Sequence, residues 1–131
     1  MRSSPAHAGC RGSATVEFAL VMPVLLLVCL ALVQVGVFAR DQLLVVQASR
    51  AGARQAAVDP DDASVRAAAA MAAPGLEAGR LEIVVERAGG RGEPVRVTVG
   101  YVDPVRVPLA GLLFPSEAHL AAEAVMRQEF G

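Results

Sequence analysis

The chain has 131 residues, a formal net charge of −1 and 54% hydrophobic residues. This length leaves room for one small domain besides an apolar segment. Its 12 basic residues, all arginine, form no dense cluster, which argues against nucleic acid as a partner. The two cysteines, Cys10 and Cys29, lie in a polar N-terminal stretch and in an apolar run, and they indicate neither a disulfide scaffold nor a metal site.

Residues 1–12 are polar and carry two arginines, and a long apolar run follows them. No charged side chain occurs from Phe18 to Ala39. As a helix this run spans roughly 33 Å, enough to cross the ~30 Å hydrocarbon core of a bilayer. It therefore predicts a membrane-spanning helix at about residues 18–39. A cleaved secretory signal is the alternative, but its apolar part is normally only about 7–15 residues long.

Two residues mark the start of the apolar run. Gly12 precedes it, and Glu17 stands five residues later, directly before Phe18. A carboxylate at the rim of a membrane helix is costly unless it is paired or solvated, so Glu17 is a candidate functional residue. The alternative is an ordinary acid in the first helical turn, stabilised by the helix dipole and wetted by lipid headgroups.

Strong helix formers continue beyond the apolar run, so one helix is predicted over residues 13–58. Ala48, Gly52 and Ala56 recur every four residues and form a smooth face suited to close helix packing. Arg50 and Arg54 have the same spacing and lie on a different face. The smooth face can pack on the domain of its own chain, on another subunit, or on both.

Residues 59–131 are expected to form a small external domain that begins with a second helix. Asp59 suits the N-cap of this helix, Pro60 its first position and Asp62 its third, and the helix should run from about residue 60 to residue 73. The aspartates lack the spacing of an EF-hand calcium loop, so no metal site is expected.

From residue 81 the apolar residues alternate with polar ones, which is the pattern of strands. Two such runs, 81–86 and 95–101, flank a glycine-rich turn and predict an antiparallel hairpin. An apolar connection, Leu109–Phe114, should be buried in the domain, against a partner or in the membrane. Residues 116–130 combine helical propensity with strand alternation. Because a lone hairpin is only marginally stable, we predict a third strand there.

The predicted fold class is therefore α+β: a long N-terminal membrane helix that extends into a domain with a second helix and a three-stranded antiparallel sheet. No catalytic residues are expected. His7 and His119 lie at opposite ends of the chain without a motif around them, and the turn at Gly89–Gly92 feeds a strand, unlike a phosphate-binding loop. We expect no enzyme activity, cofactor or metal.

The segment from Gly12 to the apolar run, GSATVEFALVMPVLLL, resembles the class III signal of type IV pilins and pseudopilins. More closely, it is similar to the start of TadE-like minor pseudopilins of tight-adherence (Flp) pilus systems. Residues 47–57, QASRAGARQAA, resemble the Ala/Arg/Gly-rich segment of the same family.

This resemblance implies a structural role in pilus assembly or secretion. A prepilin peptidase would cut between Gly12 and Ser13, and Glu17 would become the fifth residue of the mature chain. Residues 1–12 would be a cytoplasmic leader, and the C-terminal domain would be extracytoplasmic. The implied partners are the peptidase, other pilin or pseudopilin subunits, the assembly platform and membrane lipid.

Two other readings remain open. One is an uncleaved single-pass membrane protein whose external domain binds an extracytoplasmic partner or ligand. The other is a small secreted protein released by an ordinary signal peptidase near Ala39. Ser13 also differs from the aromatic residue or methionine at the first mature position of many pilins, which leaves methylation of the new amino terminus open.

Overall fold

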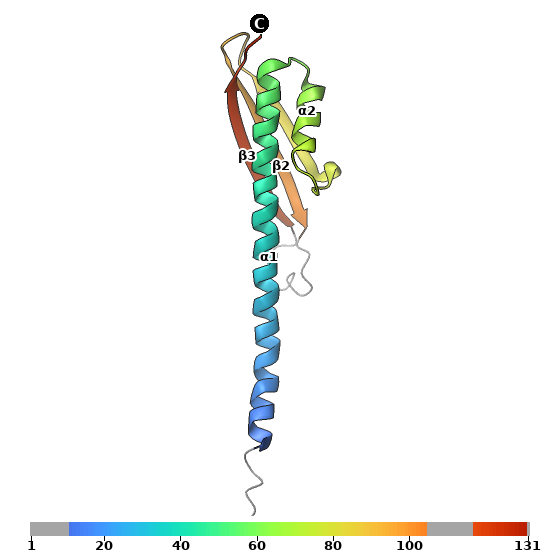
Figure 1. Cartoon of the computed structure of the whole chain (residues 1–131), viewed down its shortest axis with the longest axis vertical. Helices are drawn as coiled ribbons and strands as arrows, with labels where there is room; N and C mark the ends of the chain where they lie inside the picture. The colour runs from blue at the N-terminus through green and yellow to red at the C-terminus, as the bar shows by residue number, and fades with distance from the viewer. Residues whose placement is uncertain (1–10, 105–116, 131) are drawn as a thin grey trace, which may run out of the picture.

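One helix organises the fold. The computed structural model describes residues 11–104 and 117–130, and helix α1, Arg11–Val58, runs along the full length of the molecule (Figure 1). Its N-terminal half projects alone, and its C-terminal half is the spine on which the other elements pack. The polar residues 1–10 and the apolar connection Leu109–Phe114 lie outside the described residues.

A second helix and a three-stranded sheet complete the domain. Helix α2, Asp62–Met71, is followed by the short 3₁₀ helix η1, Ala78–Arg80. The strands are β1, Leu81–Arg87, β2, Pro94–Pro104, and β3, Glu117–Arg127. The predicted α+β fold class is thereby confirmed, including the third strand at the end of the chain.

The sheet is antiparallel with the order β1-β2-β3, and its register follows the alternation in the sequence. Val97 in β2 faces Val85 in β1 and Ala124 in β3. These three residues lie on the side of the sheet that is covered by α1 and α2. Their sequence neighbours point to the other side, which we call the outer sheet face.

The core lies between α1, α2 and the covered side of the sheet, and small residues dominate the helical contribution. Because alanine and glycine keep the helix surface smooth, the helix and the sheet approach each other closely. The buried apolar residues are Val45, Ala48, Ala53, Ala56, Ala57, Val65, Ala69, Ala73, Val95, Val97, Val99, Tyr101 and Leu120.

The start of α2 differs from the sequence prediction. Its N-cap is Asp61, whose side chain accepts a hydrogen bond from the Ala63 backbone N–H. Asp59 was predicted as the cap, but its carboxylate accepts from the Ser64 hydroxyl and from the Asp61 backbone N–H. Pro60 therefore lies in the turn before the helix, because α1 extends to Val58 and the chain needs three residues to reverse direction.

Candidate membrane-anchoring and processing site

The apolar half of α1 is exposed on nearly all sides. Between Val16 and Val28, the large apolar side chains expose from 43% of their surface at Leu27 to 71% at Leu20. Among the described residues, α1 is the one helix that is long and apolar enough to cross a membrane. The rest of the chain buries none of the residues in its most apolar 18-residue stretch. It is therefore not the buried core helix of a water-soluble domain, since that many exposed apolar side chains require a lipid or protein environment.

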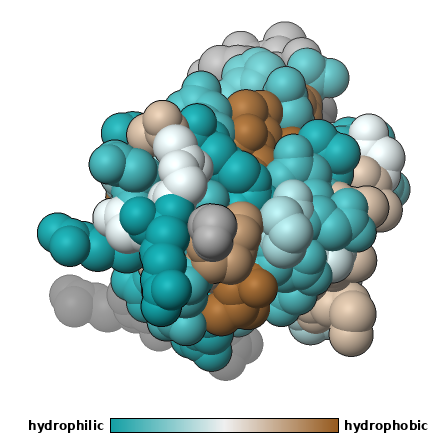
Figure 2. Space-filling view, turned by 90° about the horizontal axis from the view of Figure 1, so that it is seen from above, coloured by the Kyte–Doolittle hydropathy of each residue, from teal (hydrophilic) through white to brown (hydrophobic). Residues whose placement is uncertain are grey.

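The far end of the domain has the opposite character. Seen along the long axis from that end, the surface is largely hydrophilic, with apolar side chains in small patches (Figure 2). The molecule is thus divided into an apolar rod and a water-compatible head. This division is that of a single-pass membrane protein.

The helix continues through Pro23 in the middle of the apolar half. Proline lacks a backbone N–H, so the carbonyl of Ala19 loses its usual partner one turn earlier. Membrane helices tolerate this loss because neighbouring groups or a local adjustment satisfy the carbonyl.

Gly12 and Glu17 both lie in exposed positions near the start of α1. A Cβ atom placed on Gly12 would meet no atom within 4 Å. Glu17 lies about one helical turn after the Gly12–Ser13 bond. Among the residues that the structure describes, no hydrogen bond or ion pair involves the Glu17 carboxylate. The folded subunit thus gives neither residue a packing role.

The smooth face predicted in the second half of α1 lies against the chain's own domain. Ala48 and Ala56 are fully buried, and a Cβ on Gly52 would stand 3.0 Å from Val97 Cγ1 and 3.3 Å from Ala69 Cβ. Gly52 is therefore the point where α1 touches both α2 and the sheet. The opposite side of α1, with Arg50 and Arg54, is exposed.

Polar contacts fasten α1 to the domain where the apolar run ends. Asp41 is 2% exposed and pairs within α1 with Arg40, with Nη1 and Oδ1 3.1 Å apart, which orients the Arg40 side chain. The Gln42 side chain donates to the Ala121 carbonyl of β3 at 3.3 Å. A Cβ on Gly75, whose φ is +96°, would stand 3.0 Å from Arg40 Nη2. These contacts hold the anchor in a defined direction relative to the head.

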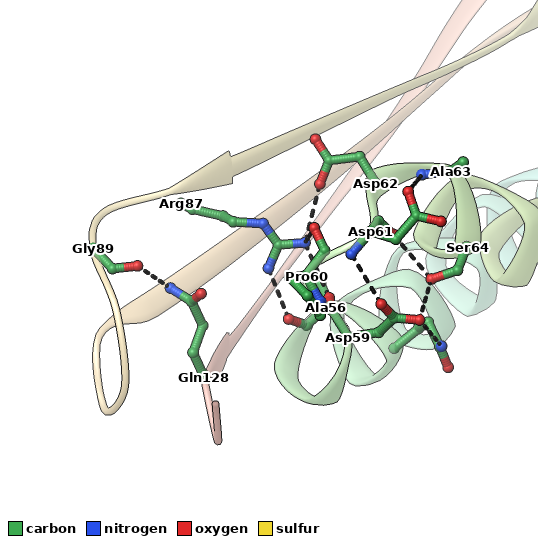
Figure 3. A network of polar contacts seen from close by, with 11 residues as sticks. Ala56, Asp59, Pro60, Asp61, Asp62, Ala63, Ser64, Arg87, Gly89 and Gln128 are labelled. Atoms are coloured by element: carbon green, nitrogen blue, oxygen red, sulfur yellow. Dashed lines mark hydrogen bonds and ion pairs between the residues drawn. The ribbon is translucent and has the colours of Figure 1, made fainter. Parts of the chain in front are cut away.

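A second polar network closes the far end of the domain (Figure 3). Arg87, at the end of β1, donates to the Ala56 carbonyl at 2.9 Å and to the Asp59 carbonyl at 3.2 Å, and pairs with Asp62 at 3.0 Å. Its guanidinium also lies over the ring of Phe130, 5.6 Å from the centroid. One cation thereby caps the C-terminal carbonyls of α1 and joins β1, α2 and the chain's end.

The C-terminal segment completes this network. The buried side chain of Gln128 donates to the Gly89 carbonyl at 2.8 Å, and the Glu129 backbone N–H donates to the Ala57 carbonyl at 2.7 Å. Neither Arg87 nor Gln128 was predicted as a functional or structural contact from the sequence. One feature of the sequence could have indicated Arg87. In β1 every second residue faces the core and is apolar, and Arg87 occupies the next of these inward-facing positions.

The three aspartates of the α1–α2 turn are engaged in local structure. The Ser64 hydroxyl and the Asp61 backbone N–H, both bonded to the carboxylate, lower the pKa of Asp59 below its usual value. Asp61 caps α2 and Asp62 pairs with Arg87. Across residues 11–104 and 117–130, no group of three or more potential ligands could hold a metal ion.

Residues 12–54 match the model of the family described as TadE-like protein. The matched segment begins at Gly12, includes Glu17 and the membrane run, and ends at Arg54, about a third of the chain. The resemblance predicted from the sequence is confirmed over these residues, and it points to involvement in Tad pilus assembly. No curated protein and no solved structure matches the chain.

Proposed function

We propose that this protein is a minor pseudopilin, a structural subunit in the assembly of a tight-adherence pilus, processed by a prepilin peptidase between Gly12 and Ser13. One observation carries the proposal: the TadE-like segment starts at Gly12, at the head of an exposed apolar helix that projects from a hydrophilic domain. In this scheme residues 1–12 stay in the cytoplasm, α1 crosses the membrane once, and the domain lies outside.

The surroundings of Gly12 support a role in processing. Open space surrounds Gly12, so packing within the subunit does not require the missing side chain. The peptidase gives a reason for the glycine, because a side chain next to the scissile bond would obstruct its active site.

The position of Glu17 supports a role in assembly. After cleavage, Ser13 would carry a positive amino group one turn before the carboxylate. In a bundle of membrane helices, Glu17 of one subunit can pair with the amino terminus of a neighbour. Because an unpaired charge in a low-dielectric bundle is costly, this pairing would favour one axial register between subunits.

A substitution at Gly12 tests the processing step. We expect Gly12→Ile to abolish cleavage, so that the chain recovered from membranes keeps the mass of residues 1–131. Gly79→Ile is a suitable control, since Gly79 also has open space around it but lies in the domain. Normal cleavage of Gly12→Ile would contradict the proposed site.

A further inference from the structure

The exposed side of the upper half of α1 carries a continuous row of side chains, which we call the basic stripe. Its members recur every three or four residues and face away from the sheet. Leu43 and Val58, at its two ends, are 63% and 54% exposed. The members of the basic stripe are Leu43, Gln47, Arg50, Arg54 and Val58.

The two arginines of the basic stripe have no partner in the described part of the chain. No hydrogen bond or ion pair to a described residue involves either guanidinium. Like charges four residues apart destabilise a helix slightly. The chain thus keeps an unfavourable pair on a face that its own domain leaves open.

Lipid headgroups are too far away to neutralise this pair. Counted from Ala39, the end of the apolar run, Arg50 and Arg54 lie roughly 16 Å and 22 Å farther along the helix. The headgroup layer extends only about 5–8 Å beyond the hydrocarbon core. A protein surface is therefore the better candidate for the opposing charge.

The outer sheet face of the same chain carries that charge. Glu82, Glu86 and Glu123 are exposed on it. Arg96 contacts both Glu86 and Glu123, so one cation is shared between two carboxylates, and Glu82 has no ion-pair partner among the described residues. Glu117 and Arg127 are exposed at the two ends of β3, so the charged residues of this face are four glutamates and two arginines, a net charge of −2 (4 minus 2).

The acidic residues and the arginines lie at matching heights along the molecule. Gly52, between Arg50 and Arg54, touches Val97 of β2. Val97 is paired with Val85 and Ala124, whose sequence neighbours are Glu86 and Glu123. The basic stripe and the acidic part of the outer sheet face therefore occupy the same level on opposite sides of the molecule.

We propose that the basic stripe is a docking surface for the outer sheet face of a second copy of this chain. Two copies anchored in one membrane stand parallel, so surfaces of equal height meet side by side. Because the two surfaces are different and lie on opposite sides, a docked pair keeps one surface of each kind free, so that a further copy can bind at either side. The proposal rests on the membrane anchoring within the proposed function and is independent of cleavage at Gly12.

Cross-linking between two tagged full-length chains in membranes tests this contact. Cys10 and Cys29 are first replaced by serine. One chain then carries Gln47→Cys in the basic stripe, and the other carries Val84→Cys, which lies between Glu82 and Glu86. With a short bismaleimide reagent, we expect a product that contains both tags. Reversing the charges with Arg50→Glu and Arg54→Glu should lower its yield roughly tenfold.

Two further variants separate a charge effect from misfolding. Adding Glu82→Arg and Glu86→Arg to the partner chain should restore the yield. Arg66→Glu, at an exposed arginine of α2 that is not part of the basic stripe, should leave it unchanged. Absence of the two-tag product, a product joining two Gln47→Cys chains, capture of a different protein alone, or an unchanged yield after charge reversal would each overturn the docking surface.

The masses in the same experiment distinguish this proposal from the proposed function. A two-tag product made of chains that keep residues 1–12 would contradict processing while supporting the docking surface. Cleaved chains that form no such product would support processing and overturn the docking surface.

Discussion

Gly52 illustrates how single small residues set the distance between the helix and the sheet. Its missing side chain lets α1 approach Val97 and Ala69 at the same point. Alanine at this position would gain about 1 kcal/mol of helix propensity. It would also force a methyl group to within 3.0 Å of a buried valine, and such overpacking typically costs about 1–3 kcal/mol.

We expect the overpacking to prevail, so that Gly52→Ala destabilises the domain by about 1 kcal/mol. The full chain in detergent can be unfolded by denaturant and followed by tyrosine fluorescence, because Tyr101 is the single tyrosine and is 2% exposed. Gly36→Ala is the matched control in the same helix, since nothing lies within 4 Å of its Cβ position. Equal stability of the two variants would refute the close packing at Gly52.

Glu17 allows a prediction at the level of one charge. Glu17→Gln keeps the size of the side chain and removes its charge, so the subunit should fold and insert normally. Loss of a buried charge pair between subunits should reduce assembly at least about tenfold, as for other desolvated pairs. The amount of this chain recovered with other pilus components measures the effect, and unchanged recovery would remove Glu17 from the assembly step.

Among the elements, helix α1 lies in two different surroundings: its N-terminal half exposes apolar side chains, and its C-terminal half packs on the domain. Asp41 and Val45 are buried on the side of α1 that faces the domain. Residues on the same side one to three turns earlier are half-buried, namely Leu30, Gln34 and Val37. The side facing the domain therefore begins within the apolar run. At its other end, α1 leaves carbonyl groups without helical partners, as every helix does. Arg87 and the Glu129 backbone supply donors to two of them.

Arg87→Met should show how much this capping contributes. Methionine keeps an apolar stem but removes the guanidinium that bonds two carbonyls and pairs with Asp62. Because the Arg87 side chain is only 20% exposed, we expect a loss of about 2–3 kcal/mol. Arg80→Met is the control, since its ion pair with Glu77 lies on the surface and should contribute less than about 1 kcal/mol. Equal effects in denaturant unfolding would contradict the capping role.

Most elements were predictable from local patterns in the sequence. The uncharged run indicated α1, and period-two alternation indicated β1, β2 and β3, because burial on one side of a sheet requires that period. The alternation in β3 prevailed over its alanine-rich helical propensity, since pairing with β2 satisfies its backbone.

The capping and the polar networks were not predictable in the same way. Asp59 and Asp61 are equally good N-cap residues in isolation, and the choice depends on how many residues the chain needs to turn from α1 into α2. The partners of Arg87 come from α1, α2 and Phe130, 25 or more residues away. Only the tertiary fold brings such groups together.

The whole molecule combines an apolar rod, the N-terminal half of α1, with a hydrophilic head. The Gln42 hydrogen bond to β3 and the approach of Arg40 to Gly75 join the two parts, so the head keeps a fixed direction on its anchor. A fixed relation between anchor and head suits a subunit that must meet its neighbours at a defined height. The proposed processing makes the Gly12–Ser13 bond the point at which the account is tested.

The most direct measurement is the intact mass and N-terminal sequence of the protein purified from the membranes of its native host. We expect a mature chain that begins at Ser13, as cleavage by a prepilin peptidase requires. A chain that begins at Met1 would contradict the pseudopilin proposal and favour an uncleaved single-pass protein. A start beyond Ala39 would remove the membrane helix and refute the anchor as well.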